Sequence, residues 1–357
     1  MTLPPPLALP LPVVIFRADA SRAIGSGHLM RCLTLAQALS ARGVSCGFLC
    51  RRADGDLIDW MREQSYFQQA GFFTLELAPD VPDVPASVAA LQALPARPAW
   101  LVVDHYQLDA DWERAIRPYA GKILAIDDLA DRPHACHLLL DQNLHPDTQR
   151  YAALLTPECQ PLLGPAFALL RPEFLSAREG LSPRNGDFRR LVVSFGGSDP
   201  QDETGKTLKA IQTLENRTWT AEVVIGGQNA RRKALEAQCA AITGVRAHVN
   251  VSYMAELMAQ ADLMVGAGGT TSWERACLGL PALVTLIAEN QRELTRHLSD
   301  RGVVRNLGAA DDVSPEAIAE ALLWAEHSPD WLREASRAGM ALVDGHGAAR
   351  VVAAMGF

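Results

Sequence analysis

A histidine stands directly behind a glycine-rich turn in the stretch "AIGSGHLMRCLTLAQALS", residues 23–40. The apolar residues after His28 recur at helical spacing, which predicts a helix that begins close to this histidine. At a helix N-terminus the dipole lowers the pKa of an imidazole and favours its neutral form, which can accept a proton from water. Gly25 and Gly27 keep side-chain bulk away from the approach to His28. We therefore expect a general base here, with a purely structural histidine as the alternative.

A second glycine-rich turn, "GAGGTTSWE" at residues 266–274, follows an apolar strand pattern and opens a helix pattern. Its bare amides, its hydroxyls and the positive end of the helix together suit a diphosphate. The residues expected around the diphosphate are Gly268, Gly269, Thr270, Thr271 and Ser272. Glu274 is expected to accept the two hydroxyls of a ribose, or alternatively only to favour the helix dipole. The glycine spacing differs from the G-x-G-x-x-G fingerprint of dinucleotide-binding proteins, and the chain lacks a Walker sequence, so neither class fits.

Polar residues also follow several other predicted strands. The turn "SFGGSDP" contains Gly197 and Ser198, and it either binds an anion or simply supplies the N-cap of the next helix. The segments "DHY" (104–106), "IDDLADR" (126–132) and "LDQN" (140–143) end strand patterns. Polar groups at such strand ends face the crevice where parallel sheets bind ligands, although each acid taken alone is explained as a loop cap. Four residues of this region could be imagined as metal ligands: His105, Asp127, His134 and His137. Their spacing matches no compact ligand motif, so neither a metal nor an organic cofactor is expected.

Short apolar runs alternate with amphipathic helix patterns, which predicts an α/β protein with parallel sheets. The strand patterns are "PVVIFRA", "CGFLCR", "FFTLEL", "WLVVDH", "KILAIDD", "LLLDQN", "RLVVSFGG", "TAEVVIGG", "RAHVNV", "DLMVGAGG" and "PALVTLI". A stretch rich in proline and glycine separates two groups of them. We predict a proline-rich leader (1–12), a Rossmann-like domain (13–170), a linker (171–186), a second Rossmann-like domain (187–330) and a C-terminal helix (331–357) that packs back on the first domain. Two doubly wound domains of this kind are expected to face each other across a cleft.

Composition limits the partners of the chain. Of its 357 residues 48% are hydrophobic and 21% charged, and its formal net charge is −8, so we expect a folded protein without a nucleic-acid surface. The apolar leader is broken by prolines and lacks the basic start of a signal peptide. The longest apolar runs are too short to span a membrane. The seven scattered cysteines are typical of reduced thiols, which predicts a cytoplasmic protein.

Taken in order, these motifs resemble one family over nearly the whole chain. The two-domain plan and the "GAGGTTSWE" turn resemble the glycosyltransferase B fold, in particular the branch with the lipid II-forming N-acetylglucosaminyltransferase. The chain more closely resembles the UDP-2,4-diacetamido-2,4,6-trideoxy-β-L-altropyranose hydrolases of pseudaminic acid biosynthesis, a nonulosonic acid route connected with flagellin glycosylation. The resemblance rests on "RADAS", "IGSGHLMRCLTLA", "DHY", "IDDL", "DQN", "LLGPAFALLRPEF", "SFGGSDP" and "GAGGTTSWERACLGLP".

The resemblance implies a reaction and a set of residues. Water would attack the anomeric carbon of a UDP-linked sugar and UDP would leave with inversion, with His28 as the base and without a metal. The 268–272 turn would hold the diphosphate and Glu274 the ribose, and we expect the uracil against Tyr253 and Met254. The residues expected to contact the rest of the substrate are Gly25, Gly27, Asp104, Tyr106, Asn143, Gly197, Ser198 and Asn290. Two alternatives stay open: a glycosyltransferase of the same fold that uses a hydroxyl acceptor, and a non-catalytic or epimerising nucleotide-sugar-binding protein.

Overall fold

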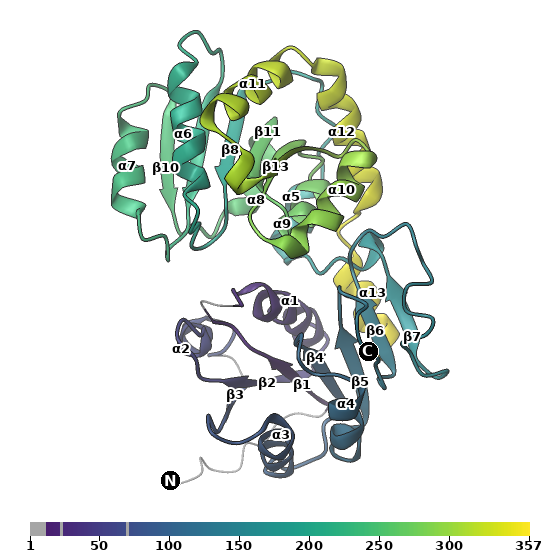
Figure 1. Ribbon diagram of the computed structural model, residues 1–357. Coiled ribbons are helices and arrows are strands. Elements are labelled where there is room, and N and C mark those ends of the chain that lie inside the picture. The colour runs from purple at the N-terminus through teal and green to yellow at the C-terminus, as the bar shows by residue number, and fades with distance from the viewer. Residues whose placement is uncertain (1–11, 22–23, 69–70) are drawn as a thin grey trace. The chain divides into compact units, whose positions relative to one another are not determined.

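The computed structural model describes residues 12–21, 24–68 and 71–357. These residues form two compact α/β units, each described by itself (Figure 1). Apart from Pro12, the predicted leader lies outside the described residues. None of the helices in the described part of the chain combines the length and the apolar composition that crossing a bilayer requires.

Unit 1 comprises the described residues up to Asn143, then Asp147–Leu169 and His346–Phe357. Its sheet has seven parallel strands in the order β3-β2-β1-β4-β5-β6-β7. The strands are β1 (Val13–Ala18), β2 (Ser45–Arg51), β3 (Phe72–Leu77), β4 (Trp100–Asp104), β5 (Lys122–Ile126), β6 (Leu138–Asp141) and β7 (Gln160–Leu163). The helices are α1 (Gly27–Ser40), α2 (Ile58–Glu63), α3 (Asp83–Gln92), α4 (Ala110–Ile116) and α13 (Gly347–Met355), with short 3₁₀ turns at Arg117–Tyr119 and Pro165–Phe167.

Side chains of β1 alternate between two apolar cores, one on each face of the sheet. Val14 and Phe16 join the core that includes α1 and α13, whereas Val13 and Ile15 join the core that includes α3 and α4. Both faces are therefore buried under helices, as continuous apolar strands require. The C-terminal helix is part of this packing, because the Trp100 indole donates a hydrogen bond to a backbone oxygen of α13, at Met355 (3.0 Å).

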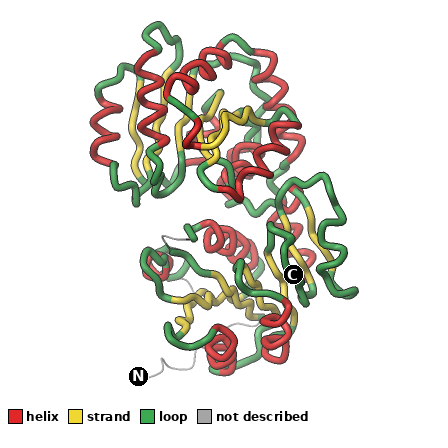
Figure 2. The backbone as a smooth tube through the Cα atoms, in the orientation of Figure 1, coloured by secondary structure: helices red, strands yellow, loops and turns green. Residues whose placement is uncertain are grey.

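Unit 2 comprises Leu144–Pro146 and Leu170–Gly345. Its sheet has six parallel strands in the order β10-β9-β8-β11-β12-β13 (Figure 2). The strands are β8 (Arg190–Ser194), β9 (Thr220–Ile225), β10 (Val245–Val249), β11 (Leu263–Ala267), β12 (Ala282–Leu286) and β13 (Val304–Ala309). The helices are α5 (Pro172–Arg178), α6 (Glu203–Thr213), α7 (Arg232–Ala240), α8 (Met254–Gln260), α9 (Thr271–Cys277), α10 (Arg292–Asp300), α11 (Pro315–Glu326) and α12 (Pro329–Leu342), with 3₁₀ turns at Glu289–Gln291 and Ala310–Asp312.

The predicted fold class, two Rossmann-like α/β units with parallel sheets, is confirmed. In both units the strand order reverses beside the first strand, which is the point where such sheets bind ligands. The sequence analysis missed two edge strands, β7 and β13, because Pro161 interrupts the first and polar residues dilute the second. It also missed α5, which lies inside the stretch predicted as a linker. The expected cleft between the domains stays a prediction.

Candidate active site

The predicted base lies where α1 follows β1 in unit 1. Helix α1 begins at Gly27, so His28 is its second residue, and its side chain is buried. Gly25 has a φ of +76°, a backbone conformation that favours glycine whatever space surrounds the residue. A Cβ placed on Gly27 would meet no atom of the described residues within 4 Å. Open space on the Gly27 side agrees with the expectation that bulk is kept away from His28.

Neighbouring strands bring Asp104 to the same place. Asp104 is the last residue of β4, and β4 pairs with β1 so that Asp104 lies opposite Ala18, just before the turn into α1. The His28 Nδ1 atom lies 2.6 Å from Asp104 Oδ1. Tyr106, two residues further along, packs its ring edge-on against the imidazole, with centroids 4.5 Å apart. Three residues expected at this site therefore lie together: His28, Asp104 and Tyr106.

Arg31 completes the arrangement, and the sequence analysis missed it. It lies one helical turn after His28 on α1, where residues three apart share a face. Its guanidinium donates two hydrogen bonds to the Asp104 carboxylate, with Nε 2.5 Å from Oδ2 and Nη2 2.7 Å from Oδ1. Its Nη1 donates to Asp128 Oδ2 at 3.0 Å. The i,i+3 spacing in "HLMR" is the signal that could have revealed it.

These charges keep the Asp104 carboxyl ionised. Burial alone would raise the pKa of Asp104, but Arg31 and His28 outweigh it and hold the pKa of this carboxyl well below its usual range. An ionised carboxylate only accepts hydrogen bonds, so His28 Nδ1 carries the hydrogen in this contact. The neutral imidazole then has its lone pair on Nε2. A histidine oriented in this way is built to take a proton at Nε2.

The ends of β5 and β6 carry a second polar network in unit 1. The Tyr151 hydroxyl lies 3.0 Å from Asp127 Oδ2 and 3.2 Å from Asp141 Oδ2. Burial raises the pKa of Asp141 to about 6, although the Asn143 amide and Arg150 oppose the shift. Asn143, a predicted substrate contact, donates its backbone N–H to Asp141 (2.9 Å). Tyr151 and Arg150 lay outside every motif and were missed.

The four residues imagined as metal ligands are not gathered. His134 Nδ1 lies 2.7 Å from Glu113 Oε1, and its Nε2 lies 3.9 Å from Asp127. His105 Nε2 lies instead 3.4 Å from Asp19, and His137 Nδ1 accepts the backbone N–H of Ile123. Each of the three rings therefore has a partner of its own.

In unit 2, β11 runs through the predicted diphosphate turn into α9, which begins at Thr271 as expected. Gly268 could not carry a side chain, because a Cβ would lie 2.7 Å from Thr295 Oγ1, and Gly269 has a φ of +95°. Thr270 is exposed, whereas Ser272 is buried and its hydroxyl accepts a hydrogen bond from Arg275 Nη2 (3.0 Å). The turn therefore presents backbone rather than side chains near Gly268.

Glu274 already has a cationic partner. Arg171 Nη2 lies 3.2 Å from Glu274 Oε1, and the Arg171 guanidinium also reaches Glu173 (2.8 Å) and stacks over Phe174. Burial raises the pKa of Glu274, and Arg171 opposes the shift only in part. Arg171 lies in the "LLGPAFALLRPEF" motif, and its contact with Glu274 was not predicted from the sequence.

The loop expected to hold the uracil is tied to β10 and β9. Tyr253 is the N-cap residue of α8, and its ring is exposed. Its hydroxyl lies 3.1 Å from His248 Nδ1, and His248 Nε2 lies 2.5 Å from Glu222 Oε2. Met254, the first residue of α8, is half-buried. This chain of contacts fixes the position of the Tyr253 ring.

The "SFGGSDP" turn contributes a cap to α6. Asp199 accepts the backbone N–H groups of Glu203 and Thr204, both at 2.9 Å, so a side chain of this turn does cap the start of α6. A Cβ at Gly226 would collide with the Gly197 carbonyl, which shows that two glycine loops pack closely here. Whether Gly197 and Ser198 contact substrate stays a prediction.

Asn290 lies in the exposed 3₁₀ turn after β12. Beside it, the ends of β12 and β13 line a shallow pocket with polar groups from Gln201, Glu289, Arg292 and Asp311. The position of Asn290 at a carboxyl strand end agrees with a ligand-facing role.

The fold defines a class of protein: both units together have the glycosyltransferase B fold. MurG of Acinetobacter baumannii superposes with a TM-score of 0.66 over 97% of this chain and 99% of that chain, at 13% identity. In sequence, the chain is 26% identical over 290 residues to the UDP-2,4-diacetamido-2,4,6-trideoxy-β-L-altropyranose hydrolase of Campylobacter jejuni. The alignment covers 81% of this chain and 97% of the hydrolase. The resemblance expected from the motifs is thereby confirmed.

A second relative matches over a shorter stretch. The chain is 30% identical over 191 residues to the spore coat polysaccharide biosynthesis protein SpsG of Bacillus subtilis. That alignment covers 53% of this chain and 56% of SpsG, so it spans only about half of each protein. No protein-family profile matches the chain.

Proposed function

We propose that the chain hydrolyses a UDP-linked diacetamido-trideoxyhexose, UDP-2,4-diacetamido-2,4,6-trideoxy-β-L-altropyranose, and releases UDP and the free sugar. The observation that carries the proposal is the contact between His28 Nδ1 and Asp104 Oδ1, which leaves Nε2 able to accept a proton. The similarity to the C. jejuni hydrolase over 81% of the chain supports this substrate. The reaction would serve pseudaminic acid biosynthesis.

In the proposed reaction, His28 Nε2 takes a proton from water while the water oxygen forms a bond to the anomeric carbon. The bond between that carbon and the diphosphate oxygen breaks, and its electron pair leaves with UDP. Attack from the face opposite UDP inverts the configuration. Asp104 stays ionised and stabilises the imidazolium that forms, while Arg31 holds the carboxylate in place. The product sugar carries the oxygen of the water.

The departing diphosphate would be stabilised by unit 2. Gly268 leaves no room for a side chain beside Thr295 and Gln291, and Arg275 fixes the turn by donating to the Ala267 carbonyl (2.9 Å). Preorganised amides can stabilise developing charge without a metal, so we propose that no metal takes part in the chemical step. The Glu274 carboxylate would accept hydrogen bonds from the ribose hydroxyls, either beside its contact with Arg171 or in place of it.

A glycosyltransferase is the second candidate, because the superposition on MurG shows the same fold. The two candidates differ in what attacks the anomeric carbon. Purified protein should be incubated with the UDP-sugar in the absence of any acceptor, and UDP release followed. The hydrolase releases UDP at its full rate, whereas a transferase releases it only after a hydroxyl acceptor is added. A binding protein releases none under either condition.

A further inference from the structure

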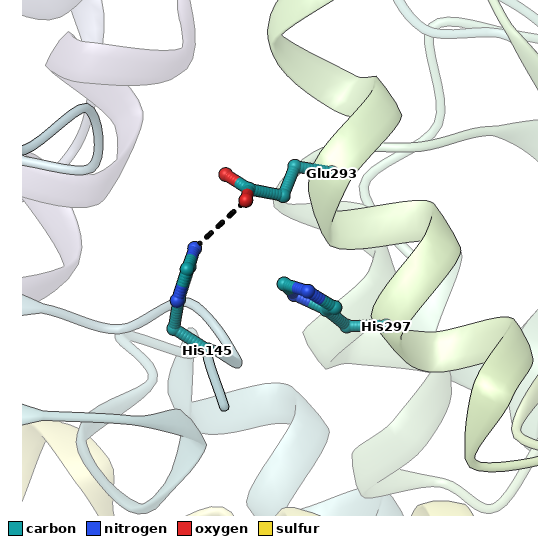
Figure 3. Close-up of side chains that lie close together, drawn as sticks. All are labelled: His145, Glu293 and His297. Carbon is teal, nitrogen blue, oxygen red and sulfur yellow. Dashed lines mark ion pairs between the residues drawn. The ribbon is translucent and has the colours of Figure 1, made fainter. Parts of the chain in front are cut away.

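Three metal-ligating side chains lie together in unit 2, outside the residues assigned to the reaction. His145 comes from the Leu144–Pro146 segment, and Glu293 and His297 come from one face of α10 (Figure 3). One ligand atom from each side chain lies within 4.8 Å of the other two. Glu293 and His297 are four residues apart, the spacing that places two side chains on the same side of a helix.

We propose that His145, Glu293 and His297 bind a zinc ion. Two imidazoles and one carboxylate are a ligand set that suits Zn²⁺ with a water in the fourth position. Imidazole nitrogen favours zinc and its transition-metal neighbours, whereas Mg²⁺ and Ca²⁺ prefer sites made of oxygen alone. The two histidine nitrogens therefore favour zinc or a neighbouring transition metal over Mg²⁺ and Ca²⁺.

The hydrogen bonds of His297 support this role. Its Nδ1 lies 2.9 Å from the Leu144 carbonyl oxygen, which can only accept, so Nδ1 carries the hydrogen and Nε2 the lone pair. A backbone carbonyl that receives the second ring N–H is the usual way to fix the tautomer and orientation of a metal-binding histidine. His297 is buried, so this orientation is held by its surroundings.

His145 supplies a second suitable nitrogen. Its Nε2 lies 3.0 Å from Glu293 Oε1, as the dashed line of Figure 3 marks. Its Nδ1 is buried and has no hydrogen-bond partner among the described residues. A buried ring nitrogen without a partner costs free energy; an ion bound at Nδ1 would remove that cost, whereas an ion bound at Nε2 would leave it in place. The two imidazoles pack edge to face, with centroids 4.9 Å apart.

Two adjustments accompany binding. Tetrahedral zinc places its ligand atoms about 3.3 Å apart. The three side chains must therefore rotate to bring their ligand atoms, now within 4.8 Å of one another, closer together. Glu293 is more than half exposed, and its carboxylate already lies 3.0 Å from His145 Nε2. Arg296 Nη2, now 2.6 Å from His297 Nε2, must turn away. Arg296 is also more than half exposed, and its Nη1 lies 3.2 Å from Asp300, a contact it can retain.

A bound ion would tie the 144–146 segment to α10. Helix α10 begins directly after Gln291, whose side chain a Cβ at Gly268 would touch. Zinc at this position would thus stabilise the helix that packs against the proposed diphosphate turn. None of the three proposed ligands has an assigned part in the proposed reaction.

Cobalt(II) is the probe, because four-coordinate Co²⁺ absorbs visible light and occupies zinc sites. Tag-free full-length protein, freed of metal with a chelator, is titrated with Co²⁺ and then with Zn²⁺. We expect one Co²⁺ per chain, with absorption that Zn²⁺ abolishes. His145→Ala and Glu293→Gln should each weaken binding by at least about 10²-fold, since even loss of an outer partner costs 10–100-fold.

His327→Ala is the matched control. His327 is an exposed histidine of unit 2 whose Nδ1 bonds the Leu323 carbonyl, so its loss should leave Co²⁺ binding unchanged. As a second readout, Zn²⁺ should raise the thermal unfolding midpoint of the wild type and of His327→Ala, but not that of His145→Ala. Wild-type protein without the Co²⁺ absorption would overturn the proposal, and so would unchanged binding in His145→Ala and Glu293→Gln.

Discussion

The Asp104 carboxylate lies 2.6 Å from His28 Nδ1 and is held at both of its oxygens by Arg31, so a buried anion orients the imidazole. Asp104 is the final residue of β4, and His28 is at the start of α1, two elements joined through the pairing of β4 with β1. The contact therefore depends on the architecture of unit 1 alone. It gives the proposed base a defined tautomer.

Loss of either member of this pair should slow turnover. His28→Ala removes the base and should lower the rate of UDP release by about 10²–10⁴-fold, the range of general-base catalysis, with little change in UDP affinity. Asp104→Asn should also lower it, and should destabilise the fold by about 3–5 kcal/mol because Arg31 loses a buried partner. Steady-state assays and thermal unfolding measure the two effects.

The double variant tests whether the two residues act as one unit. In a His28→Ala background, Asp104→Asn should slow UDP release little further, since the carboxylate acts through the imidazole. Rate losses that multiply in the double variant would contradict a shared role. Near-normal turnover in His28→Ala would show that His28 is not the base and that its role is structural.

Glu274 is predicted to bind the ribose of UDP. Glu274→Ala removes one or two charge-assisted hydrogen bonds and should weaken UDP binding by about 2–4 kcal/mol. Isothermal titration calorimetry with UDP measures this loss. Glu173→Ala is the control, because Glu173 shares the Arg171 guanidinium but has no assigned ligand contact. Equal UDP affinity in Glu274→Ala and wild type would remove Glu274 from the site.

Asp141 should make the stability of the protein depend on pH. Its pKa is raised by burial from 3.8 to about 6, so the folded state binds this proton more tightly than the unfolded state does. The cost of the buried charge is present in full above pH 6 and is relieved as the pH falls toward 3.8. Between pH ~7.5 and ~5, wild type should gain about 1 kcal/mol of unfolding free energy relative to Asp141→Asn.

Denaturant unfolding of both proteins at the two pH values checks this. The difference between wild type and variant is the relevant quantity, because it cancels the contributions of the other titrating groups. A difference that is constant with pH, or that moves against the wild type in acid, would contradict the raised pKa of Asp141.

Chelator should separate the proposed reaction from the proposed zinc site. Because amides and a helix end are proposed to stabilise the diphosphate, EDTA should leave UDP release intact below the unfolding temperature. The same treatment of zinc-loaded protein should lower its unfolding midpoint. Turnover that stops in EDTA and returns with Mg²⁺ or Mn²⁺ would show that the diphosphate is held in another way.

Local patterns predicted much of the fold and of the site. Continuous apolar runs indicated the strands, and the glycine-rich turn at 266–274 opens helix α9 as expected. The edge strand β7 escaped because an edge tolerates Pro161 and needs no apolar run. His28 and Asp104 were expected from their positions beside a glycine turn and at a strand end.

Partners contributed by distant segments could not be predicted in the same way. Arg171 reaches Glu274 across 103 positions of sequence, and Tyr151 joins the carboxylates of two strands. The grouping of His145 with α10 likewise depends on tertiary packing. Such contacts follow from how elements pack, and no local spacing records them.

The central claim, that water attacks the anomeric carbon, is tested most directly by isotope labelling. The reaction is run in water enriched in oxygen-18, and the UDP and free sugar are analysed by mass spectrometry immediately after a single turnover. One labelled oxygen should appear in the sugar and none in UDP, and His28→Ala should form labelled sugar at a greatly reduced rate. Label in the terminal phosphate of UDP would mean attack at phosphorus, and would contradict the account.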